Sequence, residues 1–364
     1  MRQTDKKILT VFLLIALAML GGVPLAHSSL STASDKSLAF IENVLPLDIS
    51  RYSVTLRSYG VPELPDLGLT QPFHGEQEIL TYDLKAEDSM LEVICTLQDD
   101  VLYSCNMYTM QGSVINDRQY SDVTDAAVSF LQKYQSNSKM DSTELITTLS
   151  KVDPTKNVTE TSDNLKLTVT HQDLSGTWFG DSTDLRWVKT YSGCDYLSIA
   201  VSFQDGVFSG FIDYRQLYSI GDTTVKISEE QAKKISLEAI KTYSYSMSND
   251  WIVTDFEVKE DEISANLQAR IKDGNVFYPA WSVVLPLNGV YPGSVRELLV
   301  GIWAGSGEVY LVNHQAYGDA NLPDTSASEN GVASIDMGTI AIVAAVTTLV
   351  LIAVSAFLIS KKRK

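Results

Sequence analysis

Two segments of the chain, 106 residues apart, repeat one pattern of alternating apolar residues around a turn. The first segment, 91–108, reads LEVICTLQDDVLYSCNMY, and the second, 197–214, reads LSIAVSFQDGVFSGFIDY. Alternation with period two predicts half-buried strands, and the Asp-Asp and Asp-Gly dipeptides predict the turns between them. The chain is therefore expected to contain the same β-hairpin twice, which favours a fold built from repeated sheet units.

Helical patterns and further strand-like runs precede these hairpins. Three amphipathic helices are expected from Ser34, Ser121 and Ser228, each opening on a serine suited to N-capping. In the third helix, Ser228 and Gln231 form a capping box. A third hairpin, VGIWAGSGEVYLV from Val300, is predicted to turn at its Gly-Ser-Gly sequence.

These elements predict the α+β fold class. We expect tandem units of one helix packed on an antiparallel sheet of about four strands, followed by a C-terminal transmembrane helix. The units are placed at residues 34–114, 121–217 and 226–317. A single large mixed domain is the alternative. In tandem units, one face of each sheet would stay open to a partner or a neighbouring unit.

Both ends of the chain carry targeting patterns. Residues 1–28 combine a basic start, an apolar run and a small-residue cleavage site after Ser28, which predicts a signal peptide; an uncleaved anchor is the alternative. Residues 337–360 contain no charge and are long enough to cross a bilayer. The stalk 318–336 and the basic tail 361–364 complete a single-pass protein of the cell membrane, with its bulk extracytoplasmic and its C-terminus cytoplasmic.

Charge limits the kinds of partner. The whole chain has a net charge of −17, and the acidic excess outside the ends is larger because seven basic residues lie within the two targeting patterns. Such a surface repels nucleic acid and anionic lipid head groups, so no nucleic-acid partner is expected. A soluble acidic exterior is the simpler interpretation, and attraction of cations or basic proteins is the other.

The three cysteines lie in a segment predicted to be extracytoplasmic, where disulfides persist. Cys95 and Cys105 are equidistant from Asp100, so the first hairpin would place them opposite each other and close enough to bond. Two separate buried thiols are the alternative. Cys194 has no cysteine at the matching position and is expected to be free or buried.

No known catalytic motif or phosphate-binding loop is present in the sequence. The predicted mature part holds three separated histidines, so no catalytic residue, metal ligand or cofactor is expected. Asp99, Asp100 and Asp205 are interpreted as turn formers. Asp181 and Asp184 lack the spacing of a calcium loop, and a turn is preferred there as well.

Two surface features remain as candidates. Asn157 begins the only N-glycosylation sequon, within a polar loop. The five tryptophans lie in the second and third predicted units, where most are expected in the core and a subset on an open sheet face would make a binding surface.

The third predicted unit resembles the PepSY domain. The resemblance rests on the helix ISEEQAKKISLEAI, 227–240, and on the hairpin WAGSGEV, 303–309, which is similar to the family's DAxTGEV with tryptophan in place of aspartate. The wider layout looks like that of archaeal-type cell-surface proteins with a signal peptide and a C-terminal anchor. PepSY-like domains imply protein binding or peptidase inhibition outside the cytoplasm, and they imply no catalytic residues.

Three functions follow, in order of preference. The first is a membrane-anchored extracytoplasmic protein, not an enzyme, that binds a peptidase or another protein or peptide through its α+β units. The second is a structural, envelope-associated surface protein. The third is a hydrolase that uses two carboxylates brought together by the fold.

Overall fold

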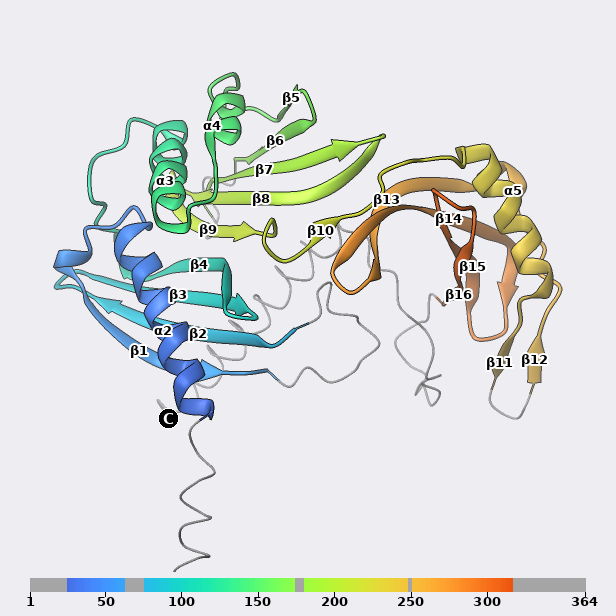
Figure 1. Cartoon of the computed structure of the whole chain (residues 1–364), viewed down its shortest axis with the longest axis horizontal. Coiled ribbons are helices and arrows are strands. Elements are labelled where there is room, and N and C mark those ends of the chain that lie inside the picture. The colour runs from blue at the N-terminus through green and yellow to red at the C-terminus, as the bar shows by residue number, and fades with distance from the viewer. Residues whose placement is uncertain (1–24, 63–74, 174–179, 248–250, 317–364) are drawn as a thin grey trace, which may run out of the picture. The chain divides into compact units, whose positions relative to one another are not determined.

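The computed structural model describes residues 25–62, 75–173, 180–247 and 251–316, which form a mixed α/β fold of mainly antiparallel sheets (Figure 1). The chain divides into two compact units. The first contains the described residues up to Lys226 together with Leu267–Ala280. The second contains Ile227–Asn266 and the described residues from Trp281 onward.

The first unit is built on one antiparallel sheet of nine strands in the order β1-β2-β3-β4-β9-β8-β7-β6-β5. The sequence patterns explain the strands, since buried and partly exposed residues alternate along β3 and β8. The strands are β1 (Ser53–Gly60), β2 (Gln77–Lys85), β3 (Ser89–Gln98), β4 (Val101–Gly112), β5 (Val158–Ser162), β6 (Leu165–Gln172), β7 (Ser182–Tyr191), β8 (Cys194–Gln204) and β9 (Val207–Asp213).

The two hairpins with matching sequences meet at the centre of this sheet. Hairpin β3–β4 and hairpin β8–β9 join where β4 pairs with β9 in antiparallel register. Cys105 lies opposite Phe211 in this register, and these two residues are separated by the offset of 106. The expectation of separate tandem units is therefore wrong for the first two, because their strands share hydrogen bonds in one continuous sheet.

Three helices pack against the sheet over a single core: α2 (Leu25–Asn43), α3 (Val123–Ser138) and α4 (Thr143–Leu149). The ring centroid of Phe211, at the join of β4 and β9, lies 5.5 Å from that of Phe40 on α2 and 5.1 Å from that of Phe130 on α3. Because side chains from both hairpins and both helices share this core, the first unit buries its apolar face as one body.

The helix starts differ from the predicted serines in two places. Helix α2 already includes Ser34 in its interior, and the chain enters α3 through Asp122, whose carboxylate accepts a hydrogen bond of 2.8 Å from the Asp125 amide. Aspartate caps a helix as well as serine does, so the neighbouring Ser121 is not needed. The short helix η1 (Ile49–Arg51) links α2 to β1.

The hairpin of β13 (Ser264–Asp273) and β14 (Val276–Tyr291) gives residues to both units. In the first unit, the two-residue strand β10 (Ser219–Ile220) pairs in parallel with the start of β14. In the second unit, β14 continues into a sheet with β15 (Val295–Trp303) and β16 (Val309–Ala316).

The predicted helix and hairpin of the third segment are confirmed. Helix α5 (Glu229–Ala239) starts with the complete capping box of Ser228 and Gln231, continues into η2 (Ile240–Thr242), and packs on β15 and β16. Strands β15 and β16 form the hairpin that turns at the Gly-Ser-Gly sequence. A two-stranded ribbon, β11 (Tyr245–Met247) and β12 (Trp251–Val253), and the short helix η3 (Glu260–Glu262) complete the second unit.

The predicted targeting segments fall almost entirely outside the described residues. These are the signal peptide up to residue 24, the stalk 318–336, the span 337–360 and the tail 361–364. Within the described ranges, no helix is both long and apolar enough to cross a membrane. Ser28, the predicted cleavage position, lies within the first residues assigned to α2.

Candidate functional site

Cys95 and Cys105 face each other across β3 and β4, as their spacing predicts. Both side chains are fully buried, and their Sγ atoms lie 4.0 Å apart as free thiols. Burial raises the pKa of the Cys105 thiol well above its ordinary value, which disfavours the reactive thiolate form of this residue. The disulfide stays a prediction. Cys194 is also a buried free thiol.

Asn157 lies directly before the edge strand β5 and is exposed. Its Oδ1 atom accepts a hydrogen bond of 2.6 Å from the backbone amide of His171 on β6. The side-chain nitrogen that would carry a glycan is therefore on a side chain held at the sheet edge. Use of this sequon stays a prediction.

The turn aspartates of the two hairpins each fasten the start of a neighbouring strand. The Asp99 carboxylate accepts a hydrogen bond of 2.8 Å from the Glu76 amide, and the Asp205 carboxylate accepts one of 2.9 Å from the Asp181 amide. Both turn residues have positive φ, 47° and 50°. Their interpretation as turn formers agrees with this geometry, and among the described residues no group of acidic, histidine or cysteine side chains could hold a metal ion.

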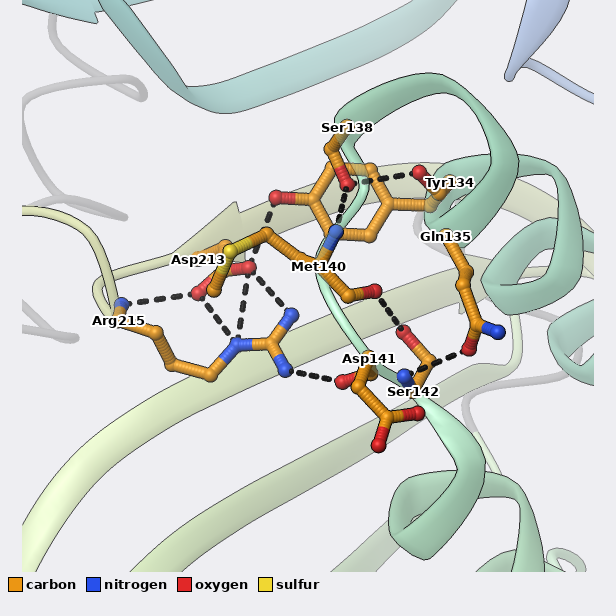
Figure 2. Close-up of polar contacts among 8 residues, drawn as sticks. All are labelled: Tyr134, Gln135, Ser138, Met140, Asp141, Ser142, Asp213 and Arg215. Atoms are coloured by element: carbon orange, nitrogen blue, oxygen red, sulfur yellow. Dashed lines mark hydrogen bonds and ion pairs between the residues drawn. The ribbon is translucent and has the colours of Figure 1, made fainter.

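A buried polar network in the first unit joins the end of β9 to α3 and the α3–α4 connection (Figure 2). Asp213 is 2% exposed, and its carboxylate accepts a hydrogen bond of 2.8 Å from the Tyr134 hydroxyl. Arg215 donates to both Asp213 oxygens through Nε, at 3.0 and 3.1 Å, and through Nη2 at 2.7 Å. The Nη1 atom of Arg215 donates a hydrogen bond of 2.8 Å to the Asp141 carbonyl oxygen.

The same network fixes the turn after α3 (Figure 2). The Ser138 hydroxyl donates a hydrogen bond of 2.8 Å to the Tyr134 carbonyl and accepts one of 3.1 Å from the Met140 amide. The side-chain oxygen of Gln135 accepts a hydrogen bond of 2.7 Å from the Ser142 amide. The amides of Met140, in the connection, and of Ser142, directly before α4, thereby gain partners that no helix supplies. The turn between α3 and α4 is thereby held onto β9.

Electrostatics make this network a structural connection more than an acid–base site. Burial raises the pKa of Tyr134, and the neighbouring Asp213 charge raises it further. Burial by itself would lower the pKa of Arg215, but its hydrogen bonds and ion pair with Asp213 outweigh that effect and raise it. Tyr134 is therefore held neutral, and Arg215 is held charged, near neutral pH.

Two shallow hollows lie on the described surface of the first unit. One, of about 440 Å³, is lined by residues that include Arg51, Glu87, Asp88 and Asn116, and the other, of about 340 Å³, lies between α3 and α4. Neither is lined by a histidine or a cysteine. These hollows lack the pairing of a nucleophile with a histidine base that many hydrolases use.

The tryptophans separate into interior and exposed positions. Trp187 is fully buried, and its indole N–H donates a hydrogen bond of 2.9 Å to the Thr148 hydroxyl. The indole N–H of Trp281 donates a hydrogen bond of 2.8 Å to the Ile227 carbonyl, and Trp303 stacks on Tyr310. Trp251 on β12 is different, because 60% of it is exposed. Trp178 lies outside the described residues. Trp251 is thus the most exposed of the four described tryptophans, and a role in binding stays a prediction.

The β11–β12 ribbon is buried at its base and exposed to solvent at its end. The base pair, Tyr245 and Val253, is buried, and the Tyr245 ring stacks on His314 at 4.3 Å. The residues nearer the end of the ribbon are exposed instead. Trp251, which pairs with Met247, is 60% exposed, and Ile252 is 59% exposed. A ribbon fixed in this way presents large apolar side chains to solvent without unfolding.

Two exposed carboxylates, Asp255 and Glu257, follow β12 along the chain. Beyond β12 the chain runs beside the end of β14. There the Glu257 amide donates a hydrogen bond of 2.7 Å to the Tyr291 hydroxyl, which in turn donates one of 3.3 Å to the Asp255 carbonyl. These bonds hold the segment of Asp255 and Glu257 beside Tyr291 at the end of β14.

Sequence reasoning missed the pair of Asp213 and Arg215, and it did not single out Trp251 among the five tryptophans. Asp213 and Arg215 belong to the segment FIDYRQ, in which nothing distinguishes a buried ion pair from an exposed one. Trp251 and Ile252 open a β-branched run that reads as an ordinary half-buried strand. In both cases the decisive fact is burial, which depends on residues distant in the chain.

No protein-family model and no curated protein matches the chain in sequence. Among solved structures, the C-terminal domain of YpeB from Bacillus megaterium is similar to it at 12% identity with a TM-score of 0.28, over 79% of this chain and 97% of that one. This similarity is too weak to assign a fold or a function.

Proposed function

We propose that the protein is a membrane-anchored, extracytoplasmic binding protein whose partner is a protein or a peptide. The observation that carries the proposal is the exposure of Trp251 and Ile252, at 60% and 59%, on a ribbon whose base is buried. Large apolar side chains grouped on a surface are typical of interaction sites, and tryptophan is enriched where binding energy is concentrated.

The cellular setting in this proposal comes from the ends of the sequence. The apolar segment 337–360 and the basic tail 361–364 support anchoring in the lipid bilayer with the C-terminus in the cytoplasm. The net charge of −17 disfavours nucleic acid as the partner. The protein is proposed to act by binding and not as an enzyme.

The finer form of the proposal is peptidase restraint. It follows from the PepSY resemblance of the helix at 227–240 and the hairpin at 303–309. A protein that holds a peptidase would slow its turnover without contributing a catalytic residue. Binding of another surface protein, without inhibition, is the broader form.

Affinity capture with the full chain from native membranes tests the broad form. The full chain should retain a specific protein, and a Trp251→Ala variant should retain less of it. Adding the full chain to native extracts should also slow proteolysis of a denatured protein substrate if the finer form holds. The binding proposal fails if nothing is retained and proteolysis is unchanged.

A structural role is the competing outcome of the same experiment. If the captured protein is the chain itself, and the purified full chain forms ordered assemblies, an envelope-associated structural protein replaces the binding proposal. A carboxylate-dependent hydrolase would instead appear as cleavage of a substrate by the purified full chain alone.

A further inference from the structure

Strand β16 belongs to a hairpin that repeats the geometry of the two matching hairpins of the first unit. Each of the three hairpins has a β-bulge close to its turn, where the second strand carries one extra residue. The extra residues are Tyr103 in β4, Ser209 in β9 and Tyr310 in β16. Two residues after the bulge, all three strands therefore reach the same structural position, which is occupied by Cys105, Phe211 and Val312.

In the first unit, this position is the centre of the contact between the two hairpins. Cys105 of β4 lies opposite Phe211 of β9. The flanking pairs are Ser104 with Ile212 and Asn106 with Gly210. The residue before the centre of each strand thus faces the residue after the centre of the other. Two copies of one strand adopt this register about a two-fold axis, because every contact then occurs twice.

The outer edge of β16 is open among the described residues, since β16 pairs with β15 alone. Edge strands usually carry charged residues that oppose pairing with another chain. The other described edge strands of five or more residues do so, with Arg57 in β1, Glu160 in β5 and Arg270 in β13. Strand β16 reads VYLVNHQA and contains no aspartate, glutamate, lysine or arginine. Two copies of it therefore pair without bringing like charges together.

The backbone of β16 directs the required groups to this edge. The His314 amide donates a hydrogen bond of 2.9 Å to the side-chain oxygen of Asn313, so this amide is turned away from β15. Backbone groups alternate in direction along an antiparallel strand, so the Val312 amide and carbonyl face the open edge as well. Both groups are needed there, because the two residues of a hydrogen-bonded pair exchange their N–H and C=O groups.

From this geometry we infer that the protein forms a homodimer in which β16 pairs in antiparallel register with β16 of a second copy, as β4 pairs with β9. Val312 then lies opposite Val312 of the second copy, and Leu311 lies opposite its Asn313. Helix α5 packs on β15 and β16, so both α5 helices lie on one face of the joined sheet. Pairing uses this edge of both copies, so the assembly closes at two. The inference goes beyond the proposed function, and a closed dimer differs from the extended assemblies of a structural protein.

Sedimentation velocity of the full chain in uncharged detergent tests the inference, and the parent should be a dimer that dissociates on dilution. Leu311 and Asn313 are half-buried and lie on the opposite face from Val312, which packs on the core. Leu311→Asp/Asn313→Asp places carboxylates opposite each other in both flanking pairs and should weaken dimerisation about tenfold or more. Leu311→Lys/Asn313→Asp places opposite charges there and should retain the dimer.

Two controls separate this edge from general effects of charge and folding. Ser53→Asp/Thr55→Asp adds the same charge at two exposed residues of the edge strand β1 and should leave dimerisation unchanged. Circular dichroism of every variant should match that of the parent. The register has its own test, since a mixture of Leu311→Cys chains and Asn313→Cys chains should form a disulfide-linked dimer with a thiol oxidant, and either variant alone should form much less.

Several outcomes would overturn the inference. A chain that stays monomeric up to about 100 µM has no such dimer. A dimer that the Leu311→Asp/Asn313→Asp variant forms equally well is held together elsewhere, and equal cross-linking by Leu311→Cys alone rejects the register. If the parent is monomeric and captures another protein that this double aspartate variant loses, a foreign strand occupies the edge. Capture that depends on Trp251 is measured separately, so the proposed function and the dimer fail independently.

Discussion

At the scale of single residues, the first unit depends on a buried charge. Asp213 is 2% exposed, and its carboxylate accepts hydrogen bonds from the Tyr134 hydroxyl and from Arg215. A charge in the interior is tolerated when its hydrogen bonds are satisfied, but removing one member leaves the other desolvated and unpaired. The network therefore connects β9 to α3 through groups that cannot be changed singly without cost.

Substitution of Asp213 should be among the most destabilising changes in the first unit. Asp213→Asn leaves Arg215 without its counter-charge, so the free energy of unfolding should fall by about 3–5 kcal/mol. Tyr134→Phe removes one of the bonds to the carboxylate and should cost about 1–3 kcal/mol. Urea denaturation followed by circular dichroism measures both.

An exposed ion pair provides the control for this prediction. Asp153 and Lys156 lie 2.7 Å apart with side chains 47% and 74% exposed, so Asp153→Asn should leave the free energy of unfolding essentially unchanged. Equal effects of Asp213→Asn and Asp153→Asn would mean that the buried network does not support the fold.

At the scale of elements, the two matching hairpins use the same turn chemistry. In each, an aspartate with positive φ reaches back to the strand that begins beside it, and a glycine makes room for its carboxylate. A β-carbon on Gly75 would lie 2.2 Å from Asp99 Oδ2, and one on Gly180 would lie 2.3 Å from Asp205 Oδ2. The turn residue thus sets where the neighbouring strand starts.

Two glycines of the second hairpin region should therefore respond differently to alanine. Gly206, with φ of 75°, has no atom within 4 Å of an added β-carbon, so Gly206→Ala should cost only the strain of the left-handed conformation, about 1–2 kcal/mol. Gly180→Ala adds displacement of Asp205 and loss of its hydrogen bond, about 1–3 kcal/mol more. Thermal and urea unfolding of both variants measure the difference.

A double-mutant cycle shows whether the carboxylate causes that difference. In an Asp205→Ala background, Gly180→Ala should lose its additional cost, because the group that the new methyl displaces is gone. Additive effects of the two substitutions would show instead that Gly180 is required for some other reason.

At the scale of the whole molecule, buried and half-buried tyrosines make the fold sensitive to alkali. Burial raises the pKa of Tyr120 and Tyr245 to about 12, and it also raises the pKa of Tyr214 and Tyr218. Burial raises the pKa of the Cys194 thiol to about 12 as well. All of these groups are neutral when protonated, so the folded chain holds protons that the unfolded chain releases.

Stability should accordingly be lost on the alkaline side. The contribution of these groups is fully present below the pKa values of the unfolded chain, roughly 9–10, and is lost as the pH rises through the folded values near 12. The free energy of unfolding from urea denaturation at pH 7, 9, 10 and 11 measures this loss. A free energy that stays constant or rises to pH 11 would contradict it.

Tyr196→Phe is the matched control for the alkaline prediction. Tyr196 is fully buried, and burial raises the pKa of its hydroxyl. The variant should change stability at pH 7 by only about 1 kcal/mol and should lose less stability above pH 10 than the parent, because one titrating group is removed. An unchanged alkaline slope would assign the loss to other groups.

The sequence by itself determined the local structure. Alternation predicted strands β3, β4, β8 and β9 and their turns, and the capping box predicted the start of α5, because these signals involve residues only a few positions apart. The facing of Cys95 and Cys105 followed from hairpin register for the same reason. The targeting segments at the two ends remain sequence-based predictions.

Only the tertiary structure decided how these elements combine. The pairing of β4 with β9 turned two expected units into one nine-stranded sheet, and the contacts of Tyr134 and Arg215 buried Asp213. The exposure of Trp251 was also decided at this level. Every strand offers similar hydrogen-bonding edges and a similar apolar face, so a local sequence pattern does not indicate which strand pairs with which. Packing across the whole fold selects the pairs.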